Sequence, residues 1–270
     1  IRIFPENANN WPDIKNLKFD SEELKIGNEE IRLNIKNIGA IRTYNRKILN
    51  WHNNENNKNN NLLIPFILGS GMGSLLIQNN FLLLHGNALH KKGKTIICLG
   101  HSGYGKSTIA YFLMKRGWQL ISDDLIAINK DNFLVPGISR IKLCLDMVNF
   151  LKLDPRKLKN IPYANYYKYI FTNCNNIKGL GDLSLKSIYI IRSWKEYNTS
   201  SKVNVQEEIS QKNKLLHLNN SIYRPIYVKY LMKEELYFLH LTKLAKSIPM
   251  YLLNTPKGLT NLRNFINELN

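Results

Sequence analysis

The sequence has few cysteines, no long apolar run and few acidic side chains for its number of basic ones. The three cysteines, Cys98, Cys144 and Cys174, are widely spaced and form no CxxC pair, so a disulfide scaffold is excluded and a reducing, cytoplasmic compartment is favoured. The longest apolar-rich stretch, residues 62–84, is interrupted by proline, glycine and polar residues, and we expect no membrane-spanning segment. No signal-peptide pattern is visible.

Charge is the unusual property of this composition. The 270 residues include 38 Lys and Arg against 20 Asp and Glu, a formal net charge of +18 with a pI near 9.7. Residues 151–270 contain 19 of the basic and 8 of the acidic side chains, so most of the excess lies there. Such a balance suggests an anionic partner, which could be nucleic acid, acidic lipid, polyphosphate or an acidic peptide.

The hydrophobic pattern predicts short β segments first and an α/β arrangement afterwards. Residues 29–51 are predicted to form short β segments because Ile31, Leu33 and Ile35 alternate with polar side chains, and the asparagine-rich run at 53–61 is predicted to be a loop. Further strands are expected at 81–84, 95–99, 119–122, 125–128, 133–135, 141–143, 185–192 and 249–253. Helices are expected at 62–77, 106–115, 205–218, 234–247 and 259–269, the last with Thr255 as N-cap and Pro256 at its first position. The basic segment 151–182, rich in Tyr and Asn, is predicted to be a loop.

One motif carries clear chemistry. The segment from Gly100 to Ser107 reads GHSGYGKS and matches GxxxxGK[ST], with an apolar strand before it and a helix after it. Backbone N–H groups of such a loop and the helix N-terminus bind phosphate oxygens, Lys106 reaches the β- and γ-phosphates, and the Ser107 hydroxyl is a ligand for Mg²⁺. The predicted nucleotide-binding residues are Gly100, His101, Ser102, Gly103, Tyr104, Gly105, Lys106, Ser107 and Thr108.

A pair of carboxylates ends the strand that follows. Asp123 and Asp124 stand at a strand end, where ligands bind in open α/β sheets, and can hold Mg²⁺ or accept a hydroxyl proton. An isolated Asp pair is more often a turn or a helix cap, but one strand from a P-loop the functional interpretation is favoured. His85 follows the strand before the P-loop strand. A lone histidine is usually structural, yet His85 could orient Asp123 if the strands are neighbours.

These motifs together resemble the HPr kinase/phosphorylase family. The matching segments are a core at residues 83–128 (LLHGNALHKKGKTIICLGHSGYGKSTIAYFLMKRGWQLISDDLIAI), its continuation at 134–143 (LVPGISRIKL) and a tail at 247–266 (SIPMYLLNTPKGLTNLRNFI). The pattern is similar to the smaller HPr-kinase-like proteins, which include kinases that phosphorylate a C-terminal serine in lasso-peptide biosynthesis.

The resemblance implies an α/β fold with a P-loop core like that of HPr kinase and PEP carboxykinase. It implies a small β-rich N-terminal subdomain at residues 1–61 and a catalytic domain at 62–270. It also implies that Asp123 is the base toward the acceptor hydroxyl, that Asp124 lies near the metal together with Ser107, that His85 supports Asp123, and that Lys106 acts on the transferred group. Arg140 is a weaker candidate for clamping phosphate, and Arg224 a weaker one still. Family members are often oligomeric, so a homo-oligomer is one expectation.

The sequence also departs from the family pattern. Enzymes that act on HPr usually have Glu after GKS, where this chain has Thr108, and their C-terminal loop motif for the reverse reaction has no counterpart here.

Our hypothesis is therefore a kinase that uses ATP and Mg²⁺ to phosphorylate a serine-type hydroxyl of a peptide or small protein, such as the C-terminal serine of a lasso-peptide precursor. We interpret the charge as a preference for an acidic acceptor. One alternative is an HPr-type kinase/phosphorylase. Another is a nucleic-acid-associated P-loop NTPase, which the basic, tyrosine-rich segment 151–182 motivates but which we do not favour. A non-catalytic nucleotide-binding protein is disfavoured because Lys106, Ser107 and both aspartates are present.

Overall fold

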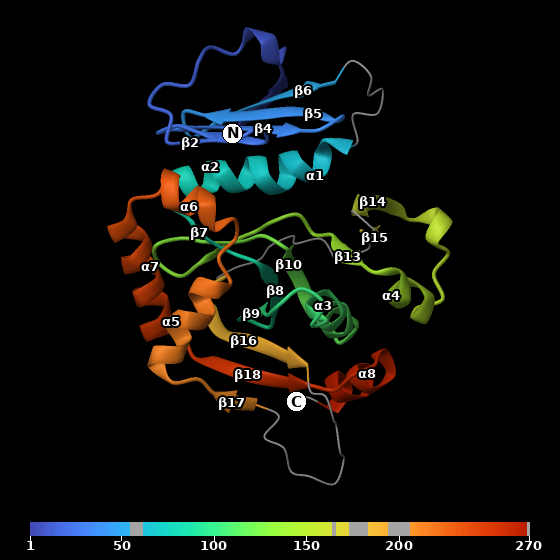
Figure 1. Cartoon of the computed structure of the whole chain (residues 1–270). Helices are drawn as coiled ribbons and strands as arrows, with labels where there is room; N and C mark the ends of the chain where they lie inside the picture. Colours follow the sequence, from blue (N-terminus) through green and yellow to red (C-terminus); the bar gives the residue numbers. More distant parts are fainter. Residues whose placement is uncertain (55–61, 164–165, 173–182, 194–205, 269–270) are drawn as a thin grey trace. The chain divides into compact units, whose positions relative to one another are not determined.

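The computed structural model describes residues 1–54, 62–163, 166–172, 183–193 and 206–268. The chain forms two compact units, and each is described by itself. The first comprises Ile1–Leu83 and Ile222–His240, and the second comprises Leu84–Ser221 and Leu241–Asn270. Figure 1 labels most of the helices and strands of both units.

A six-stranded sheet with the order β1-β6-β5-β4-β3-β2 forms most of the first unit. Its elements are β1 (Arg2–Pro5), the 3-10 helix η1 (Ala8–Asn10), β2 (Phe19–Asp20), β3 (Leu24–Ile26), β4 (Glu30–Ile35), β5 (Gly39–Tyr44) and β6 (Ile48–Asn53). All neighbours are antiparallel except β1 and β6, which are parallel. Apolar residues of β3 to β6, such as Ile26, Ile41 and Leu49, are buried and form one side of this unit's core.

Helices α1 (Ile64–Phe66) and α2 (Met72–Gln78) pack on this sheet, and a π-helical turn, η3 (Ile67–Gly71), joins them. A side chain at Gly71 would collide with Leu49, so glycine permits the close approach of helix and sheet. Ser74 of α2 shares a buried 2.6 Å hydrogen bond with Thr43 of β5. The short helix α6 (Pro225–Leu231) completes the unit.

A second six-stranded sheet, with the order β10-β8-β9-β16-β18-β17, is the centre of the second unit. Its strands are β8 (Gly86–Lys91), β9 (Lys94–Leu99), β10 (Gln119–Asp123), β16 (Leu185–Ser193), β17 (Gln206–Glu208) and β18 (Met250–Thr255), and β7 (Leu82–Leu84) leads into β8. Strands β9, β16 and β18 are parallel, whereas β8 is antiparallel to both β9 and β10. The carboxyl ends of β9 and β10 therefore meet the beginning of β8 at one edge of the sheet.

The remaining elements of the second unit surround this sheet. They are α3 (Lys106–Lys115), β11 (Ile126–Ile128), β12 (Leu134–Val135), β13 (Ile141–Leu143), α4 (Leu145–Phe150), η4 (Pro155–Lys157), β14 (Lys159–Tyr163), β15 (Tyr166–Phe171), α5 (Gln211–Asn220), α7 (Glu234–Ser247), which contributes residues to both units, and α8 (Leu259–Glu268). Strands β13, β15 and β14 form a small antiparallel sheet in that order.

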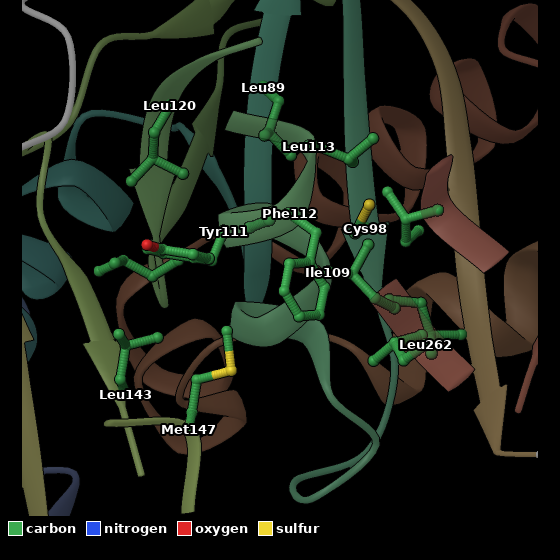
Figure 2. Packing of buried hydrophobic residues seen from close by; sticks show 14 of the residues in the cluster. Leu89, Cys98, Ile109, Tyr111, Phe112, Leu113, Leu120, Leu143, Met147 and Leu262 are labelled. Atoms are coloured by element: carbon green, nitrogen blue, oxygen red, sulfur yellow. The ribbon is translucent and has the colours of Figure 1, made fainter. Parts of the chain in front are cut away.

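Helix α3 is the centre of the core of the second unit (Figure 2). Its Ile109 and Phe112 are almost fully buried and pack in one cluster with Cys98 of β9, Leu120 of β10 and Leu262 of α8. Their positions at helical spacing fix α3 against the sheet. The start of α3 is thereby held at the sheet edge where β9 and β10 end.

The prediction of an α/β fold is confirmed, with a β-rich N-terminal sheet. The helices at 106–115 and 234–247 and the strand at 141–143 have the predicted bounds. Within the described residues, no helix is both long and apolar enough to span a membrane.

Three local predictions are wrong. The segment 151–182, predicted to be a loop, contains η4, β14 and β15, because strand pairing with β13 orders it despite its polar composition; its residues 164–165 and 173–182, with Cys174, lie outside the described part. The helix expected at 205–218 begins as strand β17, and only α5 is helical. Thr255 does not cap a helix: it ends β18, and its hydroxyl donates to the Arg192 carbonyl at 3.1 Å.

The domain boundary expected after residue 61 stays a prediction. The compact unit that holds the N-terminal sheet extends to Leu83 and includes Ile222–His240. Helices α1 and α2 belong to it because they cover the sheet's apolar face.

Candidate functional site

The predicted phosphate-binding loop connects β9 to α3 at the edge where the strands end. Gly103 and Gly105 have φ values of 86° and 83°, which favour glycine because a side chain strains the left-handed region. Gly105 is the N-cap of α3, and its carbonyl accepts the first helical hydrogen bond from Ile109 at 2.8 Å. Residues 101–104 are exposed, so the loop's surface is open to a ligand.

Lys106, the first residue of α3, turns its ammonium group back across this loop. Its Nζ donates to the carbonyl oxygens of Gly100, at 2.8 Å, and His101, at 3.1 Å. Burial lowers the pKa of Lys106 and the charge of Lys168 lowers it further, while the carboxylates of Asp124 and Asp123 act in the opposite direction. The ammonium is therefore held where the loop would meet a phosphate chain.

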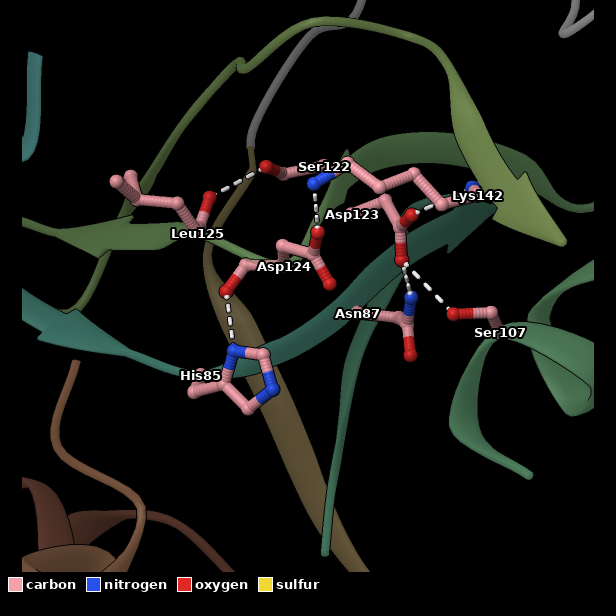
Figure 3. A network of polar contacts seen from close by, with 8 residues as sticks. All are labelled: His85, Asn87, Ser107, Ser122, Asp123, Asp124, Leu125 and Lys142. Atoms are coloured by element: carbon pink, nitrogen blue, oxygen red, sulfur yellow. Dashed lines mark hydrogen bonds and ion pairs between the residues drawn. The ribbon is translucent and has the colours of Figure 1, made fainter. Parts of the chain in front are cut away.

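Asp123 ends β10 directly opposite Asn87 of β8. Its Oδ1 accepts hydrogen bonds from the Asn87 amide and, at 3.3 Å, from the Ser107 hydroxyl, while Oδ2 accepts from the Lys142 main-chain N–H at 2.9 Å (Figure 3). Burial raises the pKa of Asp123 to about 7, and the charge of Asp124 adds to this effect. Asp123 is thus a carboxylate that can take up a proton near neutral pH.

Asp124 has a different environment although it is the next residue. It has a left-handed backbone, with φ of 70°, and its carboxylate forms an ion pair with the Lys142 ammonium. Burial opposes ionisation of this group, but the charge and hydrogen bond of Lys142 outweigh it, so the pKa of Asp124 lies below its usual value. The two carboxylates therefore differ in pKa, that of Asp124 being the lower.

His85 lies between β7 and β8 and approaches the same turn. Its Nδ1 is 3.0 Å from the main-chain oxygen of Asp124. A carbonyl oxygen can only accept, so Nδ1 carries the hydrogen and Nε2 is the basic nitrogen of the neutral ring. Burial lowers the pKa of His85, which favours this neutral form. The predicted support of Asp123 by His85 stays a prediction, since the contact is with the main chain of its neighbour.

The structure thus brings Lys106, Ser107, Asp123, Asp124 and His85 together in one unit, as expected from their motifs. Arg140 lies just before β13, and Lys142, two residues later, contacts both aspartates: its main-chain N–H donates to Asp123 and its ammonium group pairs with Asp124. His101 and Tyr104 pack edge to face on the exposed loop, with ring centroids 5.5 Å apart. Arg224 belongs to the other unit.

Three residues of the site were not anticipated: Asn87, Lys142 and Lys168. Asn87 is almost fully buried, and Lys142 stands between the buried Ile141 and Leu143. A polar residue flanked by two buried apolar residues in a strand points away from the core. This alternation could have identified Lys142 from the sequence, although the resemblance pointed to the nearby Arg140.

The residues present fit a nucleotide with Mg²⁺. Two neighbouring ligands in octahedral Mg²⁺ coordination are about 3 Å apart, and the Ser107 hydroxyl and Asp123 Oδ1 are separated by 3.3 Å. No group of three or more His, Cys, Asp or Glu side chains in the described part of the chain could hold a metal ion. Mg²⁺ does not need such a group when it is bound mainly by substrate phosphates and one or two carboxylates.

Comparisons with known proteins give sequence matches to one family. The HPr kinase/phosphorylase of Lachnoclostridium phytofermentans is 42% identical over 62 residues, which cover 21% of this chain and 20% of that protein. Those of Caldanaerobacter subterraneus and Prosthecochloris aestuarii are 45% identical over 47 residues and 36% identical over 59 residues, covering 15% and 17% of their lengths. The matches therefore span only a fifth or less of the length of these relatives.

The other comparisons carry little weight. No protein-family model matches the chain. The solved HPr(Ser) kinase/phosphatase of Coxiella burnetii aligns with 68% of this chain and 95% of its own, at 13% identity and a TM-score of 0.31. The likeness rests on sequence, and through a stretch of about a fifth of its length this chain is HPr kinase/phosphorylase-like.

Proposed function

We propose that this protein is a kinase that uses ATP and Mg²⁺ to phosphorylate a serine-type hydroxyl of a peptide or small protein. The observation that carries the proposal is the position of Asp123, whose pKa is raised to about 7: it accepts a hydrogen bond from Ser107 of the P-loop and lies close enough to Lys106 for its charge to act on that ammonium group. A carboxylate near a P-loop is poised to accept a proton during phosphoryl transfer when its pKa lies near the working pH. The sequence relatives, which are named HPr kinase/phosphorylases, support the same reaction class.

The proposed mechanism consists mainly of positioning and electrostatic stabilisation. The loop N–H groups and the Lys106 ammonium hold the phosphate chain, and Lys106 stabilises negative charge on the transferred group. Bound Mg²⁺ would neutralise phosphate charge. Asp123 accepts the proton of the attacking hydroxyl, and Asp124 stays ionised beside Lys142. The Nδ1–H of His85 holds the main chain at Asp124 and so helps to fix the turn that presents both carboxylates.

The division of roles between the two aspartates is a separate part of the proposal. We assign the base to Asp123 because of its raised pKa, and the metal side to Asp124 and Ser107. The contact between Ser107 and Asp123 favours a second assignment, in which Asp123 also contacts the metal. The variants Asp123→Asn and Asp124→Asn, titrated with Mn²⁺ and ATP, separate the two assignments. If Asp123 is only the base, D123N abolishes transfer but binds the metal–nucleotide complex normally, whereas loss of metal binding in D123N would reverse the assignment.

We propose an acidic peptide as the acceptor, with a C-terminal serine of a lasso-peptide precursor as the specific candidate and the protein HPr as the alternative. The basic excess of residues 151–270 supports an acidic partner. Of the tyrosines that motivated a nucleic-acid partner, Tyr169 packs against the core, whereas Tyr167 is exposed. Incubation with γ-labelled ATP and three acceptors tests this: a serine-ending peptide, the same peptide ending in alanine, and HPr. Label on the first peptide alone supports the candidate, and label on HPr alone would replace it.

A further inference from the structure

The small sheet β13–β15–β14 has two chemically different faces. Ile141 and Leu143 of β13 are buried in the core around α3, and Tyr169 and Phe171 of β15 pack against the same core. Because side chains alternate along a strand, the residues that alternate with these apolar positions project from the other face. Three residues of that face are lysines, one from each strand, namely Lys142, Lys168 and Lys159, and Ile161 and Ile170 lie on the same face.

The strand register defines how these lysines are placed. Lys142 and Lys159 both lie opposite Ile170 of β15, one on each side of it. Lys168 is two residues before Ile170, so it projects from the same face as Ile170 and is a diagonal neighbour of Lys142. Lys142 reaches the Asp124 carboxylate, which shows that this face is directed toward the candidate site.

Among the described residues that act on the site, positive charges outnumber negative ones. Lys168 is close enough for its charge to lower the pKa of Lys106 and of His85 and to help keep Asp124 ionised. Three ammonium groups, those of Lys106, Lys142 and Lys168, thus act on a site with two carboxylates, one of which has a pKa near 7. Mutual repulsion between Lys106 and Lys168 in a partly buried site is costly, and an anion bound between them relieves it.

We propose that Lys168 contacts the phosphoryl group that is transferred, whereas the family resemblance had offered Arg140 as a weaker candidate for clamping phosphate. The proposal rests on the proposed kinase function. Lys106 would hold this group from the loop side and Lys168 from β15, while Lys142 remains with Asp124. A cation supplied from outside the P-loop is suited to the terminal phosphate, because the loop itself encloses the inner phosphates.

Binding of nucleotides that differ only in the terminal phosphate tests this without knowledge of the acceptor. Fluorescent ADP and a fluorescent non-hydrolysable ATP analogue are titrated with Mg²⁺ into wild type, Lys168→Met and Lys168→Arg. A lost charged hydrogen bond weakens binding about tenfold to a hundredfold, so K168M should lose this much affinity for the ATP analogue and less than about twofold for ADP. K168R should retain most of the ATP affinity. The matched control is Lys159→Met, which removes a more exposed lysine from the same face and should change neither affinity.

Several outcomes would overturn the proposal. Equal weakening of ADP and ATP binding in K168M, or no weakening of either, would show that Lys168 does not contact the terminal phosphate. The same ATP-specific loss in K159M would show a general effect of surface charge. If K168M does not fold, as judged by circular dichroism, Lys168→Gln takes its place with the same expected loss. Wild type that binds neither nucleotide would instead refute the kinase function itself.

Discussion

Replacing Asp123 by asparagine should stabilise the protein in the absence of nucleotide and metal, even though it removes a residue that we place at the centre of catalysis. The carboxylate is held among protein atoms beside a second carboxylate, which is why its pKa is raised. An amide of the same shape has no charge to desolvate. The Oδ1 of Asn87 is buried without a hydrogen-bond partner among the described residues. In the Asp123→Asn variant, a flip of the Asn87 amide would turn this oxygen toward residue 123, where it could accept a hydrogen bond from the NH₂ group of the introduced asparagine.

The size of the effect follows from the pKa. Asp123 has a pKa of about 7 in the folded protein against 3.8 for an ordinary aspartate. This difference in pKa corresponds to about 4 kcal/mol. An acid whose pKa is raised by folding binds its proton more tightly in the folded state, so wild-type stability falls as the pH rises from about 4 to about 7. The advantage of Asp123→Asn should therefore be about 2 kcal/mol larger at pH 8.5 than at pH 5.5.

Urea unfolding followed by circular dichroism and tryptophan fluorescence at these two pH values measures the difference. The matched control is Asp131→Asn, which changes a half-exposed aspartate of the same unit and should show no comparable pH dependence. An Asp123→Asn variant that is less stable than wild type at both pH values would refute the reasoning. So would an advantage that shrinks as the pH rises.

Three further variants test other contacts of the site. Lys142→Met leaves the Asp124 carboxylate without its ion-pair partner and should lower the free energy of unfolding by about 1–3 kcal/mol in urea titrations, below the range for a fully buried pair because both side chains are partly exposed. Gly86→Ala places a Cβ against the Cys98 carbonyl oxygen across β8 and β9, and should cost about 2 kcal/mol or more, measured by thermal unfolding. Ser107→Ala should weaken Mn²⁺ binding in the presence of ATP about tenfold or more, since even the loss of an outer-shell contact has effects of this size. A variant whose stability or Mn²⁺ affinity equals that of wild type would contradict the role given to the contact that it alters.

The parts of the site that could be predicted are contiguous in the sequence. The P-loop from Gly100 to Ser107 forms a local strand–loop–helix unit, so its residue pattern specifies its structure. Asp123 and Asp124 could be placed because they end an apolar strand. Neither inference required knowledge of which distant segments lie beside this edge.

The missed residues depend on pairing between distant segments. Lys168 enters the site because β15 pairs with β13, and its strand shows neither the apolar alternation that marks β4 nor the continuous apolar run that marks β9. Asn87 is opposite Asp123 only because β8 lies between β9 and β10. Strand β8 was not predicted, because its polar residues hide its hydrophobic pattern. Such strands form by tertiary pairing rather than by intrinsic preference, so one sequence did not identify them.

The most direct test of the account compares wild type with Asp123→Asn in two measurements on the same samples: binding of ATP with Mg²⁺, and transfer of the labelled γ-phosphate to the acceptor peptides and HPr. We predict that both proteins bind the nucleotide with similar affinity and that only wild type transfers phosphate. Undiminished transfer by Asp123→Asn, or wild type that does not bind ATP, would contradict the account.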